Sequence, residues 1–336
     1  MIIRICAFTD RGRELAEKLE READNYIWEH RSKESNIDVW VEDSFKMRAP
    51  IVFIGAVGIA VRKIAPFVAD KLTDSPVLVI DESGAYVIPI LSGHVGGANA
   101  LSKRMAGILN AQEVITTATD VEKLFAVDVF AVKNGLKIVN RDGIKQVSSK
   151  LLAGGRISIA LPKQFEENRD NRPDCIDVVD ASLEENADVS ITSETTALLT
   201  LEPKAYVLGI GCKKETDKEK LEAFICKILE DNNIAADDVC SMASIDLKQK
   251  EYAINYFETK YRIPFYTYTA DELEAVEGEF AESAFVKSIT GVSNVCERAA
   301  MKLAGEGAEL VVHKTAYEGM TVAVAKKKSW RIEWET

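Results

Sequence analysis

The first 136 residues repeat one pattern of hydrophobic and polar positions. An apolar run is followed by a turn of small residues and then by a helical pattern. The apolar runs are residues 2–8, 51–54, 86–91 and 113–117. Near-continuous apolar strands that alternate with helices are typical of a parallel sheet covered on both faces. The pattern therefore predicts an open α/β domain over residues 1–136, with a further strand at 77–80 that enters a tight turn.

Two more segments follow this domain. Residues 137–203 have shorter apolar runs around one helical pattern and a polar loop, which predicts a smaller α+β middle segment. After it the alternation of strands and helices restarts, and predicts a second open, mostly parallel α/β domain over residues 204–336, with late strands at 310–313 and 321–325. We expect the basic tail, residues 326–336, to be a strand end or a solvated terminus.

Composition narrows the class of protein. A hydrophobic fraction of 47% is enough for buried cores, and 336 residues suit two or three domains. No apolar stretch approaches the roughly 20 residues of a membrane helix, and the N-terminus has no signal-peptide pattern. The six cysteines include no CxxC pair, which argues against a structural zinc site and a disulfide framework. We predict a cytoplasmic protein with reduced thiols and no membrane partner.

The net charge of the chain limits the kinds of partner that it can bind. The net charge of −12 disfavours nucleic acid, because phosphate binding needs a basic face. An acidic protein can nevertheless bind a polyanion when its cations are concentrated in one cleft.

The most informative segment for chemistry is residues 92–99, with the sequence SGHVGGAN. Three glycines and Ser92 surround His94 at a turn from strand to helix, where α/β proteins bind ligands. Histidine titrates near neutral pH and can also ligate a metal, so His94 is a candidate base or metal contact. A capping or packed histidine is the alternative. The chain has only two other histidines, His30 in a charged stretch and His313 in a late strand.

Two other turns of the first domain are weaker candidates. Gly55 and Gly58 form a GxxG turn before a helix whose first turns carry Arg62, an arrangement that suits an anion or serves only as a structural turn. Thr117 and Asp120 end a strand and begin a helix, where they would cap the helix or bind the substrate or a water. We expect residues 55–58 and 92–99 on one rim of the sheet.

The last domain offers two glycine turns. Gly211 and Lys213 follow a strand in GIGCKK, which lacks the remaining features of a dinucleotide fingerprint. Between them, Cys212 is either a nucleophile at a helix N-terminus or, more simply, a buried cysteine. Glu297 falls on the first turns of the helix after GVSN, where it would complement the helix dipole or act as a general base.

Taken together, these motifs resemble those of the CbiG family, the cobalt-precorrin-5A hydrolases. The strings IVFIGAVGIAVRKIAP, DESGAYVIPILSGHVGGANALS and ITTATD resemble its N-terminal domain. The strings YVLGIGCKKET, SITGVSNVCERAA and HKTAYEGMTVAVA resemble its C-terminal domain, which also occurs alone as CobE. Asn294 departs from the pattern, since relatives often carry a small residue there.

The resemblance implies a corrinoid substrate that already carries cobalt, so we expect no protein-bound metal and no other cofactor. It implies opening of a δ-lactone and release of C20 with its methyl group as acetaldehyde. This chemistry needs a base for water, donors for an oxyanion and cations for peripheral carboxylates. We expect His94 or Glu297 to be the base. The residues expected to contact the substrate are Gly55, Gly58, Arg62, Ser92, Gly96, Gly97, Asn99, Thr117, Asp120, Gly211, Lys213 and Lys314.

Two other functions compete with the hydrolase. One is a corrinoid carrier without turnover, as the likeness to CobE allows. The other is a tetrapyrrole methyltransferase, which the sequence disfavours because no glycine-rich cofactor motif with a following acidic residue is evident. A homodimer and transient contacts with neighbouring methyltransferases of the pathway are further partners that the resemblance leaves open.

Overall fold

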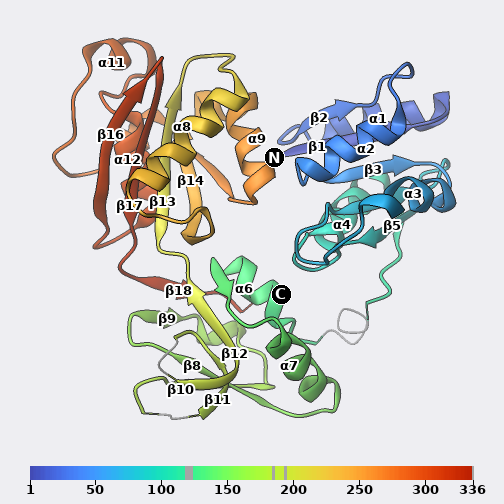
Figure 1. The fold of residues 1–336 in the computed structure, drawn as a ribbon, viewed down its shortest axis with the longest axis horizontal. Coiled ribbons are helices and arrows are strands. Elements are labelled where there is room, and N and C mark those ends of the chain that lie inside the picture. The colour runs from blue at the N-terminus through green and yellow to red at the C-terminus, as the bar shows by residue number, and fades with distance from the viewer. Residues whose placement is uncertain (118–123, 184–185, 193–194, 335–336) are drawn as a thin grey trace. The chain divides into compact units, whose positions relative to one another are not determined.

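The structure is a computed structural model that describes residues 1–117, 124–183, 186–192 and 195–334 (Figure 1). Its contacts divide the chain into two compact units. The first unit holds residues 1–121 and 255–262, and the second holds 122–254 and 263–336. The sheets are open and mostly parallel, so the predicted α/β class is confirmed. The predicted divisions at residues 136 and 203 stay predictions.

The first unit is built on a sheet with the strand order β2-β1-β3-β4-β5-β6. Its strands are β1 (Ile2–Ala7), β2 (Ile27–His30), β3 (Ile51–Ile54), β4 (Val77–Ile80), β5 (Tyr86–Leu91) and β6 (Gln112–Glu113). Its helices are α1 (Asp10–Glu22), α2 (Ile37–Lys46), α3 (Val57–Ile64) and α4 (Ala98–Leu109), with the 3-10 turn η1 (Ala65–Phe67).

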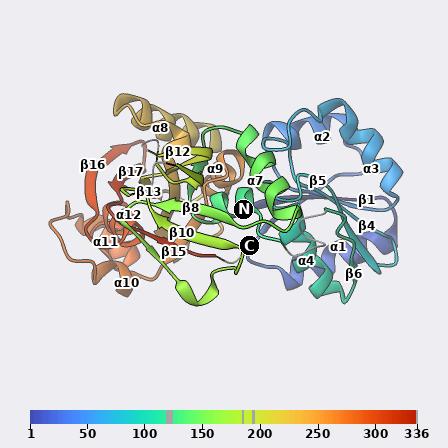
Figure 2. The ribbon, with the colours of Figure 1, turned by 90° about the horizontal axis from the view of Figure 1, so that it is seen from below.

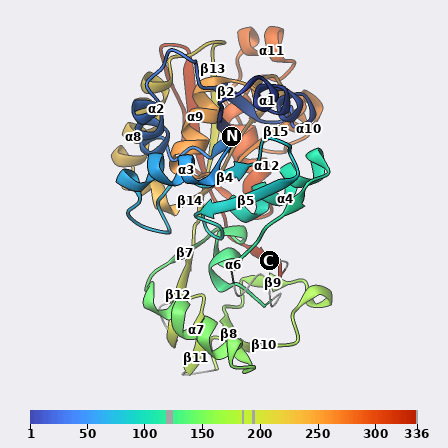
Figure 3. The ribbon, with the colours of Figure 1, turned by 90° about the vertical axis from the view of Figure 1, so that its right-hand side faces the viewer.

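Helices cover both faces of this sheet. Leu19 of α1 and Met105 of α4 pack on the face that includes Ile54, whereas Trp40 of α2 packs on the face that includes Phe53. Figures 2 and 3 show α1 and α4 on one side of the strands and α2 and α3 on the other. Successive strand residues point to opposite faces, so a strand covered on both sides must be apolar throughout. This explains the apolar runs of the sequence.

The direction of β5 contradicts the expectation of a single rim. β4 is parallel to β3, but β5 returns antiparallel to β4, with Val77 opposite Leu91. The carboxyl end of β5 therefore lies at the edge where β4 begins, and the carboxyl end of β3 lies at the other edge. Residues 55–58 and 92–99 thus occupy opposite edges of the sheet, so the prediction that they share a rim is wrong.

The middle part has a sheet of strand order β10-β8-β11-β12-β7. The bounds are α6 (Val127–Lys133), β7 (Leu136–Ile138), α7 (Asp142–Leu152), β8 (Ile157–Leu161), β9 (Phe165–Glu167), η2 (Arg169–Asn171), β10 (Ile176–Asp180), β11 (Asn186–Ser190) and β12 (Thr196–Pro203). The tail of the chain completes this part, because β18 (Trp330–Ile332) pairs with β9 and Trp334 stacks on Phe130 at 5.3 Å. Lys326 ends β17, as one of the two expectations had it. Residues 330–334 form a further strand and a core segment, with Trp334 only 1% exposed, so the expectation of a solvated terminus is wrong for them.

The last part has the order β15-β14-β13-β17-β16. Its strands are β13 (Tyr206–Cys212), β14 (Val239–Ile245), β15 (Phe265–Tyr268), β16 (Glu309–Tyr317) and β17 (Met320–Lys326). Its helices are α8 (Lys218–Asp231), η3 (Ala236–Asp238), η4 (Asp246–Lys248), α10 (Ala270–Glu274), α11 (Ala284–Thr290) and α12 (Val295–Ala304). The helix α9 (Tyr252–Tyr261) begins in this part, but residues 255–262 belong to the first unit. β13, β14 and β15 are parallel, and β17 is antiparallel to both β13 and β16. Figure 2 shows α8 and α12 on opposite faces of the strands.

No helix among the described residues is long and apolar enough to cross a membrane.

Candidate functional site

The loop at residues 92–99 is packed against itself. Ser92 is buried, has a φ of 54°, and donates its hydroxyl to the Asp74 carbonyl at 3.0 Å. A Cβ on Gly96 would lie 2.4 Å from the Ser92 Cβ, and one on Gly93 would lie 2.6 Å from Oδ1 of Asn99. The tight fold of the loop before α4 is therefore a sufficient structural reason for the presence of the glycines, Ser92 and Asn99.

His94 lies half-buried at the turn of this loop. The Gly97 N–H donates to the His94 carbonyl at 2.8 Å, so this N–H is not free to donate to a substrate. Gly97 itself has a φ of 85°, a conformation that glycine adopts without strain. Thr117 lies exposed after β6, and Asp120 lies outside the described residues.

The turn at residues 55–58 lies at the opposite edge. Gly55 has a φ of 151° and follows β3, and Gly58 lies on the first turn of α3. Arg62 is exposed on the same helix and bends back so that its guanidinium lies 3.8 Å from the position of a Cβ on Gly58. The structure thus brings Gly58 and Arg62 together, but not with His94.

In the last part, Gly209 lets α12 approach β13, and Gly211 lies beside Thr321 of β17. A Cβ on Gly209 would lie 1.8 Å from the Cys296 carbonyl oxygen, and a Cβ on Gly211 would lie 2.5 Å from Oγ1 of Thr321. These glycines were interpreted as a turn that faces a ligand. Both instead lie inside β13 and not in a turn, where Gly209 packs beneath the first turn of α12 and Gly211 packs against β17.

Glu297 is the centre of a buried polar cluster at that first turn. Only 1% exposed, its carboxylate accepts the Lys314 N–H at 2.8 Å, the Ala281 N–H at 3.1 Å and a short hydrogen bond from Asn294 Nδ2. Asn294 also caps α12, because its Oδ1 accepts the Glu297 N–H at 3.0 Å. Since a buried carboxylate is costly unless it is hydrogen-bonded, this carboxylate is held firmly and reaches little solvent.

The departure at Asn294 therefore has a clear role. An Asn three residues before a Glu is the pattern of a helix N-cap, a signal that sequence reasoning could have used. Nearby, the His313 Nδ1 lies 3.4 Å from Oε1 of Glu297, on a side chain that is 78% exposed.

Lys213 and Cys212 lie at the carboxyl end of β13. The Lys213 N–H donates to the Gly319 carbonyl at 3.1 Å, and its exposed side chain lies along Gly319 in the turn between β16 and β17. Burial raises the pKa of the Cys212 thiol to about 11, so the thiol is neutral at physiological pH. This favours a packed cysteine over a nucleophile.

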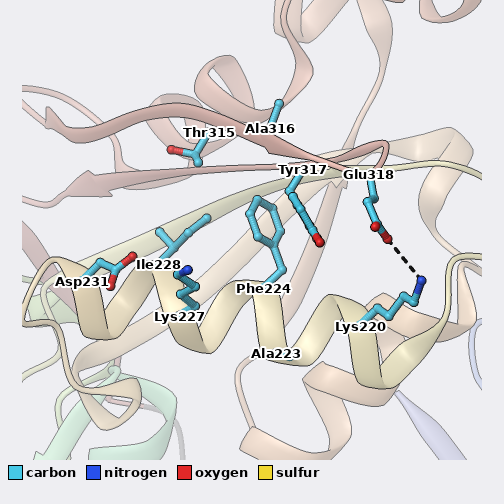
Figure 4. A pocket seen from close by; sticks show the side chains of 10 residues that line it. All are labelled: Lys220, Ala223, Phe224, Lys227, Ile228, Asp231, Thr315, Ala316, Tyr317 and Glu318. Atoms are coloured by element: carbon cyan, nitrogen blue, oxygen red, sulfur yellow. Dashed lines mark hydrogen bonds and ion pairs between the residues drawn. The ribbon is translucent and has the colours of Figure 1, made fainter.

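A groove of about 550 Å³ runs between α8 and the end of β16 (Figure 4). Phe224 and Tyr317 face one another across it with ring centroids 5.9 Å apart, and the Lys220 Nζ pairs with the Glu318 carboxylate at 3.1 Å at one end. Its lining contains none of the residues that the sequence selected. The groove and Glu297 belong to different helices on opposite faces of the sheet.

Within the described residues, no three or more His, Cys, Asp or Glu side chains cluster as a metal-binding group.

Matches to known proteins cover almost the whole chain. Residues 39–120 match the family described as cobalamin synthesis G N-terminal, residues 125–223 the cobalamin biosynthesis central region, and residues 206–325 the cobalamin synthesis G C-terminus. A cobalt-precorrin-5A hydrolase of Salmonella typhimurium is 34% identical over 292 residues, which cover 84% of this chain and 83% of that protein. A cobalt-precorrin-5A hydrolase of Priestia megaterium is 30% identical, with 96% and 94% covered. Protein CobE of Sinorhizobium is 32% identical over 42% of this chain and 93% of its own length.

Proposed function

Because the chain belongs to the CbiG family of cobalamin biosynthesis proteins, we propose that it is a cobalt-precorrin-5A hydrolase. The observation that carries the proposal is the likeness to two hydrolases of this name over most of both chains. In this reaction water opens the δ-lactone of the substrate, and C20 leaves with its methyl group as acetaldehyde. The products are cobalt-precorrin-5B and acetaldehyde, and the cobalt enters and leaves with the substrate.

Two groups of residues are proposed to contact the substrate. In the first unit, His94 is proposed to contact the corrinoid, either at its cobalt or at the lactone, from the loop that Ser92 anchors. In the second unit, Lys213, directly after β13, and Lys314, in β16 beside Glu297, are proposed to hold peripheral carboxylates. Charge-assisted hydrogen bonds of this kind are among the strongest that a surface can offer.

The test is one assay with two readouts. Purified protein is incubated anaerobically with cobalt-precorrin-5A, acetaldehyde is measured with a coupled dehydrogenase, and the corrinoid product is identified by mass spectrometry. The proposal requires acetaldehyde and product in equal amounts. Tight binding of the substrate without acetaldehyde would refute it.

That refuting result would favour the second candidate function, a corrinoid-binding carrier. The observation behind it is the likeness of the C-terminal part to CobE over nearly the whole of that protein. A carrier should bind the substrate and the product of the step with similar affinity, whereas an enzyme should release its product.

A further inference from the structure

A β-bulge lies at His313 and Lys314. Across this stretch Val312 pairs with Val324 and Thr315 pairs with Val322, so β16 has one residue more than β17. A bulge takes backbone groups out of the ladder and redirects them, and bulges are frequent next to active sites. Here the Lys314 N–H leaves the ladder and donates to Oε1 of Glu297 at 2.8 Å.

This bond places the neighbouring imidazole beside a fixed carboxylate. The His313 Nδ1 lies 3.4 Å from the same oxygen of Glu297. The carboxylate is 1% exposed and is held by the Ala281 N–H and by Asn294, whereas the imidazole is 78% exposed. With Nδ1 toward the carboxylate, Nε2 lies on the side of the ring away from it, where a substrate can approach.

We infer that His313, oriented by Glu297, is the general base that activates water for lactone opening, an inference that rests on the proposed function. The water oxygen bonds to the lactone carbonyl carbon while Nε2 takes the water proton. The acyl carbon–oxygen bond then breaks, and the imidazolium returns the proton to the leaving alkoxide. The net change is lactone plus water to acid plus alcohol, without an oxidant or reductant.

Glu297 acts in this step as a positioning residue. A carboxylate next to Nδ1 favours the tautomer that carries its proton on Nδ1, which leaves Nε2 able to accept the water proton. Its burial makes it unsuited to touch the lactone itself, so Glu297 is not the base in this inference.

The chain supplies a matched control. His30 also pairs with a glutamate, since its Nε2 lies 3.0 Å from Oε2 of Glu20, but there both side chains are substantially exposed, at 40% and 50%. A pair of this kind on the surface contributes little to stability or orientation. His30→Ala therefore removes a His–Glu pair whose carboxylate is exposed, whereas His313→Ala removes one whose carboxylate is buried.

The experiment measures acetaldehyde release, KM and melting temperature for the full chain and for His313→Ala, His30→Ala and Glu297→Gln. We expect His313→Ala to lower kcat by ~10²-fold or more at an unchanged melting temperature, and added imidazole to restore part of the rate. His30→Ala should behave as wild type. Glu297→Gln, which keeps an acceptor for Lys314 N–H, should lower kcat and leave KM nearly unchanged.

Three results would overturn the inference. One is a wild-type rate for His313→Ala. Another is a raised KM with kcat intact, which would make His313 a binding residue. The third is a loss of activity that follows a lower melting temperature and does not respond to imidazole. A wild-type protein that binds the substrate and releases no acetaldehyde would instead refute the proposed function, so the two failures are distinguishable.

Discussion

Replacing Gly209 by alanine tests whether the GIG motif serves packing or a ligand. The added Cβ would lie 1.8 Å from the Cys296 carbonyl oxygen, 2.7 Å from its carbon and 2.9 Å from the Ala300 nitrogen. A carbon and an oxygen normally approach to about 3.3 Å, so α12 must retreat by roughly 1.5 Å. All three atoms are backbone, and no rotamer change can relieve the overlap.

Overpacking of this kind costs about 1–3 kcal/mol or more, and each kcal/mol lowers the melting temperature of a unit of this size by about 2–4 °C. We therefore expect Gly209→Ala to melt roughly 2–12 °C lower. Hydrogen exchange followed by mass spectrometry should show lost protection in α12. The control is Gly107→Ala in α4, where a Cβ meets nothing within 4 Å and alanine should stabilise the helix by about 0.5–1 kcal/mol. Wild-type melting and α12 protection in Gly209→Ala would refute the packing role.

Three further predictions concern other parts of the chain. Trp334→Ala removes a stacked, 1% exposed ring and should lower the free energy of unfolding by about 3–5 kcal/mol, whereas Leu183→Ala, at an 80% exposed position, should change it by less than about 0.5 kcal/mol in the same denaturant titration. Because burial raises the pKa of the Cys212 thiol to about 11, its alkylation by iodoacetamide should be slow at pH 8 and should accelerate as the pH rises toward that value; a rate already at its plateau by pH 8 would contradict the raised pKa. His94→Ala should keep its melting temperature and alter the visible spectrum of bound corrinoid, and a stable variant with wild-type spectrum and turnover would exclude His94 from the site.

Local patterns predicted most of the strands and helices. The runs at residues 51–54 and 77–80 coincide with β3 and β4, because a strand covered on both faces has no position at which a side chain faces water. The turn at Asp81 was also recognised, but its consequence for direction was not. The Asp81 carboxylate accepts the Ser83, Ala85 and Tyr86 N–H groups, which closes a tight hairpin and reverses β5. This reversal places residues 92–99 at the edge of the sheet opposite to the carboxyl end of β3.

The candidate site was harder to predict than the fold. Its family motifs selected Glu297 and Lys314, yet the bond between them depends on a bulge in β16 that no local pattern marks. The same holds for His313, which the sequence placed in a late strand without a partner. Contacts between residues 16 or 17 positions apart arise from strand register and helix approach, and spacing alone cannot report them.

The pairing of β18 with β9 has a consequence for how the protein is made. The middle part gains residues 330–334 only after strands β13 to β17 have been synthesised, because β9 pairs with β18 in a separate two-stranded sheet. During synthesis, the strands of the last sheet emerge close together and can pack at once. The middle part must wait with Phe130 and Phe165 uncovered until Trp334 and Trp330 have been synthesised. Long-range pairing of this kind slows folding and exposes apolar surface in the interval. The middle segment is thus the stretch that a chaperone would most need to shield on the nascent chain.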